Sequence, residues 1–452
     1  MGERHALGPT DDAKAPSLSI RRCPVRARPH SMRIDAVAPV SIPFAMRTHK
    51  RVDITSARFK ADPFPFYESL RRDQPVCAVA LPNRTSAWLI SRYDDVVAAL
   101  KDPRLVKNRR NVPGSKKGGI AWTPKMFEPL TQNMLDSDPP DHTRLRTLVH
   151  KAFTPRVVER MHERIEAVAT ELLDAMTSNQ RVDLIERYAL PIPTTIIAEL
   201  IGVPVNDRHR FHRWSSAIVS ITLSAWSTVR AIPPLRAFLR YIRSQVDARR
   251  RKPQDDFLSA LVAVEESGER LNTDELVAMV FLLLIAGHET TVNLIGNGML
   301  TLLQHPHQMA QLRDAPAGVD TAVEELLRYA GPLDMATERF AREDITVGDV
   351  TIPRDAVVYA VLASANRDER QFHEPNTLDL ARQPNRHVAF GHGIHFCLGA
   401  PLARLEGQIA IRTLLQRTGG LRLAARDDAI LWRKGLVLRG VSRLPVTFER
   451  RL

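Results

Sequence analysis

The chain has 452 residues, of which 44% are hydrophobic and 25% charged, an ordinary balance for a globular protein with a large core. Its formal net charge is +13, and about half of the excess lies in residues 1–51, which hold ten Lys/Arg against four Asp/Glu. The remaining excess is diffuse and lacks a basic block with interleaved aromatics. That argues against nucleic-acid binding and favours a mildly basic face that meets an acidic protein. The three cysteines, Cys23, Cys77 and Cys397, are widely spaced, which excludes a disulfide framework and suits a reducing cytoplasm.

Residues 1–45 are rich in Pro, Arg, Ser and Ala and show no apolar period, so we predict a disordered N-terminal extension. A basic interaction arm is the alternative, and Met32 and Met46 are alternative starts. The basic residues are not followed by an apolar core, so the segment does not resemble a secretory signal. Residues 46–452 show no internal break in composition and are predicted to form one domain.

Folded structure is predicted from Asp62 onward, with a strand over 87–91 and a helix from Tyr93. Residues 107–135 hold Gly, Pro, Asn and Lys with little period, and a loop of this length is usually functional or mobile. Residues 138–251 are predicted to be mostly helical, with breaks near three groups of prolines, at 191–193, 204 and 233–234.

A long helix is predicted to begin at Thr273 and to end before His305-Pro306, a length of roughly 46 Å for about 31 residues. Its longest apolar run, Leu276–Ala286, is well short of the ~18–20 residues that cross a bilayer, so we expect no membrane anchor. Three short strands are predicted to follow, over 345–347, 350–352 and 357–361. The chain is therefore predicted to be mostly α with a minor β region.

The segment Phe390–Gly399, FGHGIHFCLG, contains three glycines that let the backbone turn tightly. Cys397 precedes a helix predicted to begin at Ala400-Pro401, so its sulfur faces the positive end of that helix, which should lower the pKa of the thiol. A thiolate held in a rigid turn suits an axial haem ligand. A buried structural cysteine is the alternative. Zinc bound by His392, His395 and Cys397 would lack the second Cys/His pair of structural zinc sites.

The pattern F-G-x-G-x-H-x-C-x-G resembles the signature of the cytochrome P450 family, whose haem iron is held by a cysteine. Other motifs follow in the family's order, so the resemblance covers about residues 46–452. It implies a cytochrome P450 fold, a triangular helical prism around a buried haem b. It also implies that Cys397 is the axial iron ligand and that four neighbours contact haem: Phe390, Gly391, His395 and Gly399.

The sequence AGHETT at 286–291, half-way along the predicted long helix, resembles the oxygen-binding groove of the family. Gly287 weakens the helix, and the Thr290 hydroxyl can bond a helix carbonyl and open a kink. The resemblance implies that Ala286 and Gly287 lie against haem and that Glu289 and Thr290 handle protons. A glycine in an ordinary buried helix is the alternative.

Glu325 and Arg328 form an E-x-x-R pair on one predicted helix face. Such pairs are common on surfaces and are uninformative by themselves. In the family the pair is buried and stabilises the loop before the cysteine. The resemblance implies that Arg386 or His387 completes this network, whose role is structural.

His142 and Arg146 are four residues apart on one predicted helix face. Haem carries two propionates, which need cations or hydrogen-bond donors. The family uses these two positions for the propionates, and the resemblance adds Arg339 and His395 as further partners. A solvated surface charge is the alternative for any one of these residues.

The activity implied by the resemblance is reductive activation of O2 and insertion of one oxygen atom into an organic substrate. About 35 residues follow the cysteine helix, so electrons are expected from NAD(P)H through an acidic ferredoxin and its reductase, with the protein a cytoplasmic monomer. Rival functions on the same fold are a peroxygenase, dehydratase or isomerase, or a haem sensor without catalysis.

The residues that the resemblance assigns to the substrate pocket are mostly apolar, which favours a lipophilic small molecule such as a polyketide, terpenoid or fatty acid. They lie in the 107–135 loop and at Ile285, Ala286, Leu333 and Met335.

Overall fold

The computed structural model describes residues 52–81, 86–115, 130–176, 180–219, 225–266 and 269–450. The chain divides into two units at His49, and the following account concerns the second, Lys50–Leu452. The predicted extension over 1–45 and the centre of the predicted loop, 116–129, lie outside the described residues.

Helices form most of the second unit, as predicted. They are α1 (Ala57–Ala61), α2 (Phe64–Asp73), α3 (Tyr93–Lys101), α4 (Asp141–Ala152), α5 (Pro155–Arg160), α6 (His162–Asp174), α7 (Pro191–Leu200), α8 (Arg208–Val219), α9 (Ala225–Arg251), α10 (Phe257–Ala263), α11 (Thr273–Gln304), α12 (Pro306–Asp314), α13 (Val319–Ala330), α14 (Leu362–Ala365) and α15 (Ala400–Arg417). Single turns occur at η1 (Arg109–Asn111), η3 (Ile185–Ala189), η4 (Val205–Asp207), η5 (Pro316–Gly318), η6 (Gly393–His395) and η7 (Asp427–Ala429).

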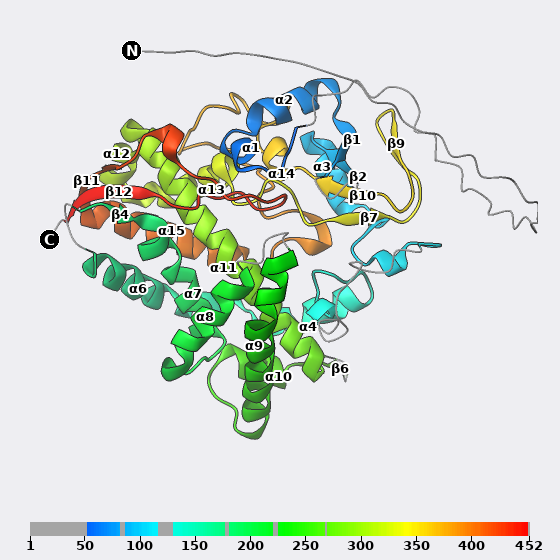
Figure 1. The fold of residues 1–452 in the computed structure, drawn as a ribbon, viewed down its shortest axis with the longest axis horizontal. Coiled ribbons are helices and arrows are strands. Elements are labelled where there is room, and N and C mark those ends of the chain that lie inside the picture. Colours follow the sequence, from blue (N-terminus) through cyan, green and yellow to red (C-terminus); the bar gives the residue numbers. More distant parts are fainter. Residues whose placement is uncertain are drawn as a thin grey trace, which may run out of the picture. The chain divides into compact units, whose positions relative to one another are not determined.

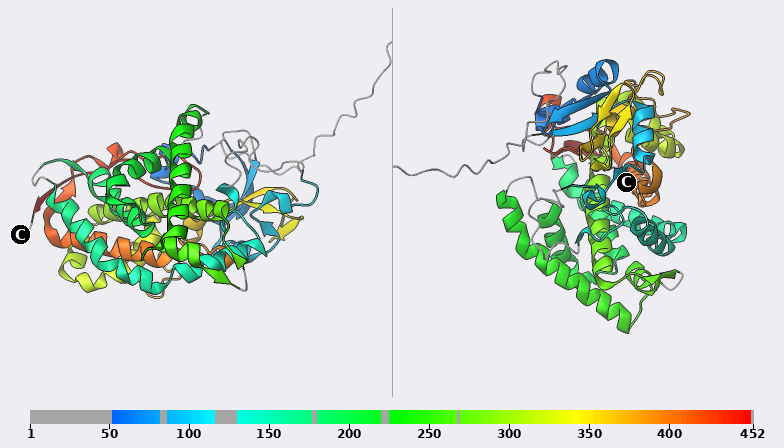
Figure 2. Two further views of the ribbon diagram at one scale, coloured as in Figure 1. Left: turned by 90° about the horizontal axis from the view of Figure 1, so that it is seen from below. Right: turned by 90° about the vertical axis from the view of Figure 1, so that its right-hand side faces the viewer.

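The strands are short and fall into small sheets. They are β1 (Val76–Ala80), β2 (Ser86–Ile90), β3 (Leu105–Val106), β4 (Val182–Asp183), β5 (Glu265–Glu266), β6 (Glu269–Arg270), β7 (Arg339–Ala341), β8 (Ile345–Val347), β9 (Val350–Ile352), β10 (Val357–Ala360), β11 (Thr418–Leu423) and β12 (Pro445–Arg450). The largest sheet has the order β1-β2-β10-β7-β3, in which β10 runs parallel to β2. Figures 1 and 2 show this sheet on one side of α11 and helices α8, α9 and α10 on the other.

Helix α11 is the central element, and it packs against α7, α9, α13 and α15. Its 32 residues begin with a capping box, in which the side chains of Asn272 and Glu275 satisfy each other's backbone N–H groups. The helical turns before and after its midpoint are buried, for example at Met279 and Leu300. Ala286, in the middle turn, is exposed. One face of the middle turn is therefore left open by its protein neighbours.

By length and composition alone, α11 could cross a membrane. Within the fold, however, 56% of its most apolar stretch is buried by other parts of the protein. That burial is the behaviour of a core helix, and it accounts for the apolar run that the sequence shows there.

The predicted helix break at Pro233–Pro234 is wrong, because α9 runs through both prolines. Proline removes a backbone donor, but its fixed φ is compatible with a helix. The following turns bury one apolar face, including Phe238, Ile242 and Val246. Packing of that face outweighs the local cost of the prolines.

The E-x-x-R pair on α13 is buried, as the resemblance implied: Glu325 and Arg328 are 0% and 1% exposed. Two hydrogen bonds of 2.7 and 2.6 Å join the guanidinium to the carboxylate. The same guanidinium donates to the carbonyls of Asn366 and Pro375. The pair therefore fastens α13 to the coil that leads to the cysteine loop.

The prediction that Arg386 or His387 completes this network is wrong. Arg382 donates to Glu325 at 3.2 Å, and Asn385 donates to its other carboxylate oxygen. His387 instead contacts Glu324 at 3.0 Å, and the backbone carbonyl of Arg386 accepts from the Tyr93 hydroxyl. Arg382 also donates to the carbonyls of His373 and Glu374, so hydrogen bonds within the coil hold an earlier arginine at the carboxylate than the sequence suggested.

We predict that Glu325→Ala lowers the free energy of unfolding of the haem-loaded protein by about 3–5 kcal/mol, because it leaves buried Arg328 without its counter-charge. An exposed ion pair provides the control. Glu171 of α6 is 67% exposed and pairs with Arg164, which is 36% exposed, so Glu171→Ala should cost only about 1 kcal/mol. Denaturant unfolding measures both variants, and equal losses would contradict a special structural role for Glu325.

Candidate haem site

The cysteine loop is a tight turn held by its own backbone. The N–H of Cys397 donates to the carbonyl of Phe390 at 3.0 Å, and that of Phe396 donates to Gly393. Gly391 and Gly393 have φ of 72° and 73°, in the left-handed region that favours glycine. A Cβ on Gly393 would also lie 2.7 Å from the carbonyl oxygen of Leu100 in α3. The sequence spacing of the glycines therefore reflects both the turn and this close approach.

Cys397 lies just before α15, as predicted, and the backbone N–H groups of Gly399 and Ala400 hydrogen-bond its sulfur. The predicted net fall in the pKa of this thiol is wrong. Burial raises the pKa above its ordinary value and outweighs the N–H groups and the charges of Arg146 and Arg404, which lower it. In a site of this kind a bound metal ion, rather than the helix, completes the conversion to thiolate.

Contacts with α13 and α15 also hold the cysteine loop in place. Arg404 of α15 stacks over the Phe390 ring at 4.4 Å and donates to Glu324 at 2.6 Å. Burial raises the pKa of Glu324, but hydrogen bonds from His387 and Arg404 outweigh it and bring the pKa to about 2. The ionised Glu324 therefore links His387, just before the loop, to the helix that follows it.

The predicted propionate partners come together in space. The rings of His142 in α4 and His395 in the cysteine loop have centroids 4.4 Å apart. Arg146, one turn further along α4, donates to the carbonyl of Phe396 at 2.8 Å. Arg339 of β7 is 6% exposed and acts electrostatically on His395. Residues from three distant parts of the chain therefore form one basic cluster.

Lys107 joins this cluster, and the sequence analysis missed it. It is 7% exposed, and its ammonium donates to Thr337 and to the carbonyl of Glu338. A lysine in a long aperiodic loop has no sequence signal that separates it from a solvated surface charge. Only the pairing of β3 with β7 brings it beside Arg339.

The electrostatics of the cluster show an excess of buried positive charge. Burial, with a smaller effect of cationic neighbours, lowers the pKa of His395 to about 2. Burial also lowers the pKa of Lys107 to about 8, against the smaller opposing effect of nearby carboxylates, chiefly that of Glu338. Burial likewise lowers the pKa of Arg339 to about 10. The buried Nε of Arg339 has no hydrogen-bond partner among the described residues. An anionic group with several acceptor oxygens would relieve both features.

The predicted oxygen groove lies in the open middle turn of α11. The Thr290 hydroxyl donates to the carbonyl of Ala286, which is the helix-carbonyl bond that the sequence predicted. The helix is continuous there, and Gly287 faces α7, where a Cβ would lie 3.1 Å from Ile197. Close helix packing therefore explains this glycine.

Glu289 is held by a residue that the sequence analysis did not identify. Arg433 donates to its carboxylate at 2.9 Å, although 144 residues separate the two along the chain. Burial raises the pKa of Glu289, and the charge and hydrogen bond of Arg433 partly oppose the rise. The carboxyl group is therefore easier to protonate than that of an ordinary glutamate.

The residues predicted to line the substrate pocket differ in exposure. Ile285 and Leu333 are half-buried and Ala286 is exposed, so each still presents surface. Met335 is 0% exposed and packs in a cluster with Phe59, Tyr67 and Leu89. The assignment of Met335 to an open pocket is therefore wrong, because the elements before α3 cover its side chain.

Haem fits the residues present on three counts. Cys397 offers a sulfur surrounded by N–H groups, the cluster with Arg339 offers uncompensated cations for two propionates, and Ala286 exposes an apolar surface on α11. Among described residues, no group of three or more His, Cys, Asp or Glu could hold a metal ion, so the alternative zinc site finds no support.

Comparison with known proteins points to the same family as the cysteine motif. A family profile described as Cytochrome P450 matches residues 231–315 and 318–418. The polyketide biosynthesis cytochrome P450 PksS of Bacillus subtilis (strain 168) is 43% identical over 395 residues, which are 87% of this chain and 97% of PksS. Vitamin D(3) 25-hydroxylase of Pseudonocardia autotrophica is 45% identical over 401 residues, 88% of this chain and 97% of that protein. The solved structure of PksS has a TM-score of 0.82 at 42% identity, over 88% of this chain and 100% of that one.

These similarities confirm the predicted fold and activity class: the chain belongs to the cytochrome P450 family and is a haem-thiolate monooxygenase, an oxidoreductase.

Proposed function

We propose that this monooxygenase hydroxylates or epoxidises a lipophilic small molecule of the polyketide, terpenoid or fatty-acid type. The relatives named for polyketide biosynthesis and for vitamin D(3) hydroxylation support a large apolar substrate. The observation that carries the proposal is the open turn of α11, where Ile285 and Ala286 present apolar surface beside Thr290. Leu333 would extend this surface on the opposite side.

Haem b would be held by Cys397 at the iron and by the basic cluster at its propionates. The cluster consists of Lys107, His142, Arg146, Arg339 and His395. Phe390, Gly391 and Gly399 of the cysteine loop and Ala286 of α11 would also contact haem. When bound, haem would supply the capacity to bind and reductively activate O2, and the protein would tune it through the Cys397 thiolate.

Glu289 and Thr290 would deliver protons to the reacting oxygen. The Thr290 hydroxyl can accept a proton on one side while it donates on the other. Glu289 would take up a proton as it leaves Arg433, since loss of that ion pair raises its pKa further. The ion pair would therefore keep the acid charged between proton-transfer steps.

Electrons would come from NAD(P)H through an acidic ferredoxin and its reductase in the cytoplasm. Exposed Lys101 and Arg386 lie near the cysteine loop, Lys101 close enough to lower the pKa of His392. A positive surface there suits an acidic iron–sulfur protein, because complementary charge steers association.

We predict that Arg339→Leu separates haem binding from stability. The variant removes a buried charge whose one hydrogen bond to the described residues is long, at 3.5 Å. It should leave the haem-free protein as stable as the wild type or more so. It should bind haem at least about tenfold more weakly, because a charge-assisted contact to a propionate contributes about 1.5–3 kcal/mol. Haem titration and thermal unfolding measure the two effects, and unchanged haem affinity would remove Arg339 from the propionate site.

We predict that Thr290→Ala uncouples the enzyme. The variant should retain haem and substrate and continue to oxidise NAD(P)H, but product should fall and hydrogen peroxide should rise to match, because protons are no longer positioned.

Two further variants serve as controls for Thr290→Ala. Thr290→Ser keeps the hydroxyl and should restore coupling. Thr291→Val removes the neighbouring hydroxyl, which bonds buried Glu406, and should cost stability without changing the peroxide ratio. Measuring product and peroxide per NAD(P)H decides the point: unchanged coupling in Thr290→Ala would contradict its proposed role.

A further inference from the structure

Three polar side chains follow Glu289 along one face of the largely apolar α11. Asn293, Asn297 and Thr301 come at successive four-residue intervals, so they lie above one another on the helix. They are 2%, 1% and 5% exposed. Such a polar line through the core runs against the burial preference of these residues.

This line faces a single stretch of chain between Trp432 and Val441. At one end, Arg433 donates to Glu289. Next, Asn293 lies directly against Gly440, where an added Cβ would meet its amide oxygen at 1.9 Å. At the other end, Asn297 donates to the carbonyl of Arg439 at 3.0 Å. The polar groups therefore lie in one continuous seam between α11 and this stretch, which we call the asparagine seam.

The asparagine seam contains buried polar atoms without partners. Among the described residues, neither amide atom of Asn293 has a hydrogen-bond partner, and the amide oxygen of Asn297 has none. An unsatisfied buried polar group costs about 1–3 kcal/mol, and in native proteins such groups are usually satisfied by ordered water. An apolar side chain at position 293 would avoid the free-energy cost of burying this unpaired amide.

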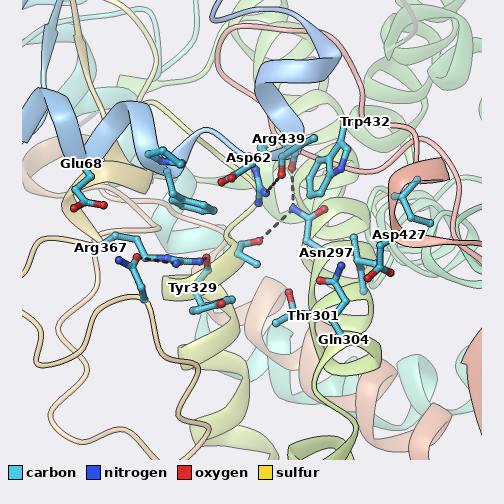
Figure 3. Close-up of a pocket in the computed structure, with 17 residues that line it drawn as sticks. Asp62, Glu68, Asn297, Thr301, Gln304, Tyr329, Arg367, Asp427, Trp432 and Arg439 are labelled. Atoms are coloured by element: carbon cyan, nitrogen blue, oxygen red, sulfur yellow. Dashed lines mark hydrogen bonds between the residues drawn. The ribbon is translucent and has the colours of Figure 1, made fainter.

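The outer end of the seam opens into a cavity of about 450 Å³. Figure 3 shows Asn297 and Thr301 on its wall, with Trp432 and Arg439 beside Asn297. Three exposed carboxylates also line it, from Asp62, Glu68 and Asp427. The cavity has room for several water molecules at about 30 Å³ each. Its polar wall can keep them in exchange with solvent.

We infer that ordered water in the asparagine seam carries protons from this cavity to Glu289. A proton taken from cavity water passes along hydrogen-bonded waters beside Asn297 and Asn293 to the Glu289 carboxylate, and the cavity water is reprotonated by solvent. The asparagines orient these waters and do not themselves change charge. The inference rests on the proposed role of Glu289, and it makes Asn293 a positioning residue. The competing route is direct access past Arg433, which is 33% exposed.

Asn293→Leu tests the inference sharply, because this amide has no hydrogen bond to lose within the described part of the chain. The thermal midpoint should equal or exceed that of the wild type. Turnover should nevertheless fall about tenfold or more, since proton transfer through a positioned group contributes about 10²–10⁴ in rate. The solvent isotope effect on product formation should rise, and Asn293→Ser, which leaves room for water and a hydroxyl to orient it, should recover most of the rate.

A high-resolution crystal structure of the haem-loaded protein gives a readout independent of turnover. It should show ordered water within hydrogen-bond distance of Asn293, continuing to the cavity, and Asn293→Leu should lose it. A dry seam, or an Asn293→Leu variant with wild-type turnover and isotope effect, overturns the inference and favours the route past Arg433. Failure of the wild-type protein to form product would instead count against the proposed function, while the crystal structure would still decide whether the seam holds water.

Discussion

The fold depends on holding the Cys397 sulfur at a fixed point. Burial opposes ionisation of Cys397, so the helix after it and the N–H groups around it can only reduce a cost that the metal must remove. The loop must therefore be rigid before the metal arrives. Its positive-φ glycines, the Phe390–Arg404 stack and the buried Glu325–Arg328 pair all serve that rigidity from different elements.

A second constraint is charge. Lys107 and Arg339 are buried close together, and burial lowers the pKa of both because it disfavours their charged forms. Such a cluster suits a fold completed by an anionic cofactor. The same principle applies to the asparagine seam, where unpaired amides indicate a further component, water, and connect the surface to the acid of α11.

The regular parts of this fold could be predicted from local sequence. The apolar period gave α11 almost to the residue, and the glycine spacing with Cys397 indicated the family, which the comparisons confirm. Predictions failed where long-range packing decides: α9 passes through Pro233–Pro234, and the covering of Met335 comes from residues far away in the chain.

The site residues likewise fall into those that a local sequence pattern indicates and those that only long-range packing brings together. His142 and Arg146 could be found because four-residue spacing on a helix is a local signal. Arg382 took the place expected of Arg386 because the path of an irregular coil cannot be inferred from composition. Lys107 and Arg433 approach the site from a loop and from a segment near the C-terminal end, so no local pattern indicated them. Their roles, like those of the predicted haem contacts, remain predictions from geometry.

The central claim is that Cys397 binds the haem iron, and the spectrum of the reduced protein with carbon monoxide tests it most directly. The account predicts the far red-shifted Soret band of a thiolate-ligated haem in the wild type, lost in Cys397→Ser. Cys77→Ser should keep the band, since Cys77 lies in β1 with a pKa that burial raises to about 11. A wild-type band typical of histidine-ligated haem, or its survival in Cys397→Ser, would contradict the account.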